Sequence, residues 1–163
     1  VLDTNALVHD LKLIGVLDFL KKRFGKIKWA NAKNVLGQSQ NGIRQPDLIS
    51  MSPTGEGLVA VELELSVKSE RTYRDIINQY GITRAYKNIL YVVGSDAIRE
   101  KIRVAITGIK TPKDERLFPT GRFYFVNLQD LNRPMGDVKI TNGTNDFDLE
   151  IAKLMTQDSM RTA

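Results

Sequence analysis

Three carboxylates lie on two neighbouring apolar stretches of this chain. Asp47 opens the first stretch, and Glu62 and Glu64 lie inside the second, residues 59–67 (VAVELELSV). The alternation of a β-strand places the valines and leucines of 59–67 on one face and both glutamates on the other. Two like charges side by side raise each other's pKa unless a cation lies between them. A divalent ion is the simplest such cation, and carboxylate oxygens suit Mg²⁺ or Mn²⁺.

The overall charge indicates the kind of partner. The chain carries a formal net charge of +5, which favours a polyanion, with nucleic acid first. The alternative is a basic protein with no such partner. A basic surface around an acidic, metal-filled pocket is what an enzyme acting on phosphodiesters needs.

Composition sets further bounds. A length of 163 residues with 42% hydrophobic content suits one domain with a core over 1–163. The sequence has no apolar run long enough for a membrane span, no signal-peptide pattern and no cysteine, so we expect a cytoplasmic protein. Because the first residue is Val1, we expect a fragment of a longer protein, with a frayed tail over 156–163.

Hydrophobic periodicity and turn residues predict the elements that position these acids. Helices are expected over 10–24, 69–81, 96–107 and 147–155, and strands over 27–33, 44–51, 57–67, 88–93 and 122–128. A turn over 52–56 and loops over 34–43 and 108–121 connect them. This order predicts a mixed α/β or α+β domain.

The order of a helix, a hairpin with Asp and then Glu-x-Glu, a helix and a strand resembles the PD-(D/E)xK superfamily. That superfamily has the restriction-endonuclease-like fold, a central mixed sheet flanked by helices. The matching residues are Pro46-Asp47 and Glu62-x-Glu64. The resemblance implies that Asp47 and Glu62 bind the metal. The third position, usually a lysine that positions or activates water, is Glu64 here, so Glu64 acts as a base, as a ligand to a second metal, or as both.

Phosphodiester hydrolysis needs an in-line hydroxide and a stabilised leaving oxygen, which carboxylate-bound metals supply. Lys68, four residues beyond Glu64, could stabilise the attacked phosphate, or it is a solvated lysine before a helix. Arg71 and Arg74 are the alternatives for the catalytic basic residue. Together with Arg44 they are also the residues we expect to contact DNA phosphates.

A narrower resemblance covers about residues 9–100. It rests on His9-Asp10-Leu11, Trp29, Arg44-x-Pro46-Asp47, the Glu62 strand, and segments 71–80 and 90–93. Together these resemble the MOB-C-type plasmid mobilisation relaxases and the replication-relaxation proteins. The resemblance implies a metal-dependent endonuclease that nicks one DNA strand at a plasmid transfer origin, with other mobilisation proteins as further partners. The single histidine agrees with a relaxase that lacks a three-histidine cluster.

Two other functions stay open on the sequence. One is a restriction or repair nuclease on the same core, and the other is a catalytically silent module that only binds DNA. His9 is structural, or it orients a ligand of the site. Trp29 and Tyr80 are expected in the core.

Overall fold

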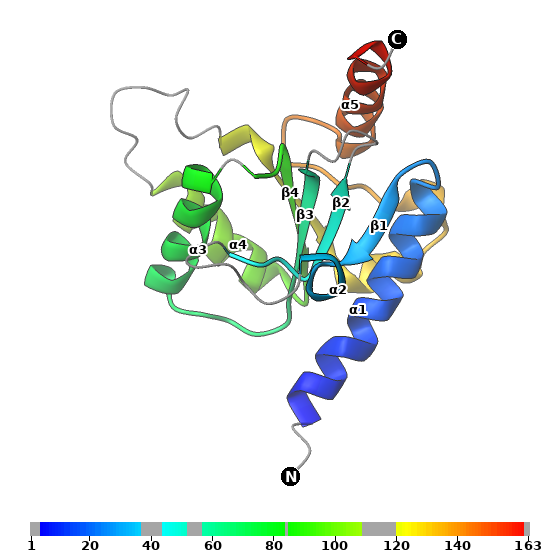
Figure 1. Cartoon of the computed structure of the whole chain (residues 1–163). Helices are drawn as coiled ribbons and strands as arrows, with labels where there is room; N and C mark the ends of the chain where they lie inside the picture. Colours follow the sequence, from blue (N-terminus) through cyan, green and yellow to red (C-terminus); the bar gives the residue numbers. More distant parts are fainter. Residues whose placement is uncertain (1–3, 37–43, 52–56, 84, 109–119, 162–163) are drawn as a thin grey trace.

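The computed structural model describes residues 4–36, 44–51, 57–83, 85–108 and 120–161. It consists of one five-stranded sheet with helices on both faces (Figure 1). The elements in chain order are α1 (Thr4–Arg23), β1 (Lys28–Asn31), α2 (Ala32–Leu36), β2 (Leu48–Met51), β3 (Gly57–Glu64), α3 (Glu70–Thr83), β4 (Asn88–Val93), α4 (Asp96–Thr107), η2 (Thr120–Arg122), β5 (Phe123–Asn127), η3 (Leu128–Asn132), η4 (Met135–Asp137) and α5 (Phe147–Arg161).

The sheet is mixed. Its strand order is β1-β2-β3-β4-β5, with antiparallel pairs β1–β2 and β2–β3 and parallel pairs β3–β4 and β4–β5. The two parallel pairs are connected through α3 and α4, as parallel neighbours require. This arrangement confirms the predicted fold class, a central mixed sheet flanked by helices.

Each face of the sheet has its own apolar core. Alternate residues of β3, starting with Val59, pack against Leu13, Val16 and Leu20 of α1 and against the residues of α5. On the opposite face Ala60 packs with the buried residues of α3 and α4. The two glutamates of β3 follow Ala60 by two and four residues, so they lie on the α3–α4 face, as the alternation predicts.

Several boundaries differ from the predicted ones. α1 begins at Thr4, so Asp10 lies inside the helix and does not cap it. β1 ends at Asn31, and the short helix α2 follows where the end of a strand and a loop were expected. α5 begins where predicted but continues to Arg161. The turn over 52–56 and most of the loops over 34–43 and 108–121 lie outside the described residues.

Candidate functional site

The acids gather where β3 extends beyond β2. β2 starts at Leu48, which pairs with Val61, so residues 62–64 pair only with β4. Asp47, the residue before β2, bonds to β3 where β2 no longer pairs with it. Its N–H donates to the carbonyl of Val61 at 3.0 Å, and its Oδ2 accepts from the N–H of Leu63 at 2.7 Å. β2 is therefore shorter than the predicted strand over 44–51. The Asp47 side chain, and not a backbone carbonyl, accepts from the Leu63 N–H.

Glu62 is held by an arginine and a tyrosine. The carboxylate is buried, and Arg44 binds both of its oxygens, with Nε 2.8 Å from Oε1 and Nη2 2.9 Å from Oε2. The Tyr80 hydroxyl on α3 also donates to Oε1. Burial raises the pKa of Glu62 above its ordinary value, although the bonds and charge of Arg44 work to lower it. Arg44 thus supplies the positive charge that was expected from a metal at this acid.

Glu64 has a different cation. The Lys68 ammonium donates a hydrogen bond to Glu64 Oε2. The Lys68 side chain is 37% exposed, and that of Glu64 is 7% exposed. Tyr73 on α3 fixes the intervening turn, because its hydroxyl accepts from the Lys68 N–H at 3.1 Å and donates to the Ser66 carbonyl at 3.2 Å. Lys68 is therefore paired with Glu64 while its side chain stays partly exposed to solvent.

His9 lies beside Asp47. Its Nε2 is 3.2 Å from the carbonyl oxygen of Leu63 and 3.6 Å from Asp47 Oδ2. Both neighbours accept hydrogen bonds, so this arrangement requires a proton on Nε2. Because α1 extends past this point in both directions, His9 contacts a site acid from inside the helix.

The three acids do not form a shared metal site in this arrangement. No group of three or more His, Asp or Glu side chains that could hold a metal ion occurs among the described residues. The reason lies in the contacts above: Glu62 binds Arg44, Glu64 binds Lys68, and Asp47 accepts a backbone N–H. These residues do not fit a metal bound by all three carboxylates.

Arg71 and Arg74, the other predicted basic residues, lie on α3 away from Asp47, Glu62 and Glu64. Arg74 forms an ion pair with Glu70 one turn earlier on α3, and Arg71 is exposed on the same helix. Neither contacts the acids in the described structure. Arg44 was expected to contact DNA and Tyr80 to lie in the core, and the bonds of both residues to Glu62 were not predicted. The Arg44-x-Pro46-Asp47 spacing was the only local signal for such a role.

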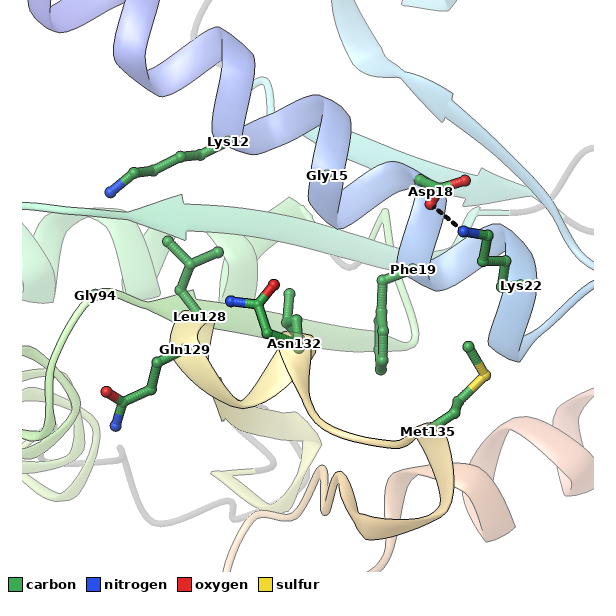
Figure 2. A pocket seen from close by; sticks show the side chains of 11 residues that line it. Lys12, Gly15, Asp18, Phe19, Lys22, Gly94, Leu128, Gln129, Asn132 and Met135 are labelled. Atoms are coloured by element: carbon green, nitrogen blue, oxygen red, sulfur yellow. Dashed lines mark ion pairs between the residues drawn. The ribbon is translucent and has the colours of Figure 1, made fainter.

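A cavity of about 660 Å³ lies on the α1 side of the sheet (Figure 2). We name it the α1–η3 cavity; its main lining residues are Lys12, Gly15 and Phe19 of α1, Gly94 after β4, and Gln129 and Asn132 of η3. Glu62 and Glu64 point to the opposite face, and none of the three acids lines the cavity.

A second hollow, of about 430 Å³, lies between α4 and the segments after β5. Four basic residues line it, namely Arg99, Arg103, Arg133 and Lys139, together with the acids Asp130 and Asp137. Basic side chains are thus in excess there.

Comparisons with known proteins give a distant structural likeness. No family model matches the chain, and no curated protein matches it. Among solved structures, the YaeQ protein from Xanthomonas axonopodis pv. citri matches with a TM-score of 0.40 and 12% identity, over 74% of this chain and 59% of that chain. The chain thus spans about three fifths of the length of that protein. In the described part of the chain, no helix is long and apolar enough to cross a membrane.

Proposed function

We propose that this chain is a DNA-processing domain that cleaves a phosphodiester bond at the end of β3. The observation that carries the proposal is the pair of buried glutamates, Glu62 and Glu64, each joined to a partly exposed cation. A buried ion pair seldom stabilises a fold more than apolar residues of the same size would. Buried charges with perturbed pKa values gather instead at functional sites.

The residues around the acids suit a phosphate substrate. Arg44 and Lys68 have side chains 30% and 37% exposed, so a phosphate oxygen can reach them from solvent. Such cations stabilise the charge that develops on an attacked phosphate. The hollow lined by Arg99, Arg103 and Lys139 supports the same substrate class, because basic grooves bind the nucleic-acid backbone.

Dependence on Mg²⁺ or Mn²⁺ belongs to the proposal through the resemblance to PD-(D/E)xK nucleases. A bound divalent ion supplies an activated water and neutralises phosphate charge. Because the three acids already have partners, a metal must compete with Arg44 and Lys68 for them. Metal dependence is therefore the first property to measure.

Within this class we propose a relaxase that nicks one strand at a plasmid transfer origin, as the motifs over residues 9–100 suggest. A restriction or repair nuclease is the alternative of the same chemistry. One observation favours a second function of a different class: the bidentate bond between Arg44 and Glu62 occupies the acid that would bind the metal. A domain that only binds DNA fits that bond.

A nicking assay on supercoiled plasmids with and without a transfer origin tests the proposal, in Mg²⁺, in Mn²⁺ and in a chelator. We expect open circles from the wild type with metal, and a loss of at least about a hundredfold for Glu64→Gln and Asp47→Asn, as for other central catalytic groups. Asp75→Asn is the matched control, because it removes an exposed acid on α3. Origin dependence separates a relaxase from a general nuclease. DNA binding without cleavage in any metal overturns the nuclease proposal and leaves the binding module.

A further inference from the structure

The α1–η3 cavity combines an apolar wall with polar groups. Phe19 and Met135 supply apolar surface, and Lys12, Gln129 and Asn132 bring an ammonium and two carboxamides (Figure 2). In the described part of the chain, these three polar side chains have no hydrogen-bond or ion-pair partner. By contrast, Lys22 at the other end of the cavity is paired with Asp18 at 2.7 Å.

Gly15 lines the cavity from an exposed position on α1. A Cβ built on Gly15 of α1 would have no heavy atom within 4 Å, so the space above this residue is empty. The volume of about 660 Å³ is within the range of sites for small organic ligands. A larger residue at position 15 would fill this space without colliding with the protein.

The cavity adjoins the acids along two elements. Lys12 follows His9 by three residues on α1, and His9 contacts the carbonyl of Leu63. Three residues of helix rise about 4.5 Å, so Lys12 is one turn away from that contact. Gly94, which lines the cavity, donates its N–H to the carbonyl of Glu64 at 2.9 Å. The cavity and the acids lie on opposite faces of the sheet but share the end of β3, so a nucleic-acid strand that reaches both must pass around this end.

We propose that the α1–η3 cavity binds one nucleotide of a single-stranded nucleic acid, next to the phosphodiester at the acids. A carboxamide donates and accepts at once, which matches the edge of a nucleobase, so Gln129 and Asn132 read the base. Lys12 contacts its phosphate, and Phe19 lies against its apolar surface. This inference rests on the proposed function for the position of the strand.

Binding of labelled single-stranded homopolymers of each base, measured by fluorescence anisotropy, tests the inference. Gly15→Leu fills the cavity, and Lys12→Gln removes its ammonium. Lys21→Gln is the matched control, since it removes a positive charge from an exposed residue of α1 outside the cavity. Unfolding midpoints verify that each variant is folded, and Lys12→Gln changes only an exposed side chain.

We expect the wild type to prefer one base over the others. Gly15→Leu should weaken binding to that base by about tenfold or more and remove the preference, because a base-edge contact discriminates by about this factor. Lys12→Gln should weaken all four homopolymers more than Lys21→Gln does. Wild-type affinity and preference in both cavity variants would overturn the inference. The failure of the proposed function is distinct, since it would show as absent nicking by the wild type.

Discussion

Tyr80 and Tyr91 are both buried beside Glu62, but only the hydroxyl of Tyr80 is hydrogen-bonded among the described residues. The Tyr80 hydroxyl donates to Glu62, whereas the Tyr91 hydroxyl is buried with no partner among the described residues. Burial, and then the charge of Glu62, raises the pKa of both phenols well above the ordinary value. Both hydroxyls are therefore neutral donors at physiological pH, and only one of them has an acceptor.

This difference predicts opposite effects of the same substitution. Tyr80→Phe should lower the free energy of unfolding by about 1.5–3 kcal/mol, because it removes a bond to a charged group. Tyr91→Phe, the matched control, should be neutral or stabilising, since it removes an unsatisfied buried hydroxyl. Urea unfolding of both variants gives the comparison. Equal losses in the two variants would show that Tyr80 does not hold Glu62.

The burial of Glu62 predicts a pH dependence of stability. Its pKa in the folded protein is raised above the ordinary 4.5. The folded state therefore keeps the proton more tightly than the unfolded state, and the contribution of Glu62 is largest below about pH 4.5 and falls as pH rises through the folded pKa. The stability of the wild type relative to Glu62→Gln should decrease from acidic to neutral pH. A relative stability that grows over this range would contradict the raised pKa.

The face on which the acids lie could be predicted from the sequence, but the partners of Glu62 could not. The alternation of residues 59–67 sufficed to put Glu62 and Glu64 on one face, because strand geometry is local. The bond from Arg44 to Glu62 spans 18 residues, and so does the bond from Tyr80 to Glu62. Such contacts depend on the register of β2 and the position of α3, which no local pattern encodes.

Among the elements, those with strong patterns were predicted best. β4 and α4 both coincide with their predicted ranges, and Ser95 Oγ caps α4 by accepting from the Ile98 N–H. α1 was predicted too short, because its first turns carry apolar residues such as Leu7 that are exposed rather than buried. The start of α1 therefore cannot be found from a stripe of buried apolar residues.

The start of β3 depends on a glycine. A Cβ on Gly57 would collide with the carbonyl oxygen of Ala85 and would come within 2.8 Å of Tyr86 Cδ1. Since a backbone carbonyl cannot move aside, Gly57→Ala should lower the free energy of unfolding by about 1–3 kcal/mol. Gly15→Ala is the control and should raise it by about 0.5–1 kcal/mol, because alanine favours the helix and has open space. Chemical denaturation measures both changes. An unchanged stability of Gly57→Ala would mean that Gly57 and Ala85 do not lie in such close contact.

On the scale of the whole molecule, the two buried glutamates are each paired with a cation, while the chain as a whole is basic. The charges of the buried Glu62 and Glu64 are balanced locally by Arg44 and Lys68, so the two glutamates contribute little field outside the site. The positive net charge of the chain therefore comes from residues outside the site, including those of the hollow beside α4. Binding of a polyanion should accordingly depend on this surface and not on the acids.

This distribution of charge predicts how DNA affinity responds to salt. Counterion release makes the logarithm of the binding constant fall linearly with the logarithm of the salt concentration, by about 0.7 per neutralised phosphate on a single strand and about 0.9 on a duplex. We expect a steep slope for the wild type and no smaller a slope for Glu64→Gln, because this variant removes a negative charge and leaves Lys68 unpaired. Arg103→Gln in the basic hollow should reduce the slope. Anisotropy titrations over a series of salt concentrations measure it, and a flat response in the wild type would exclude an interface dominated by phosphates.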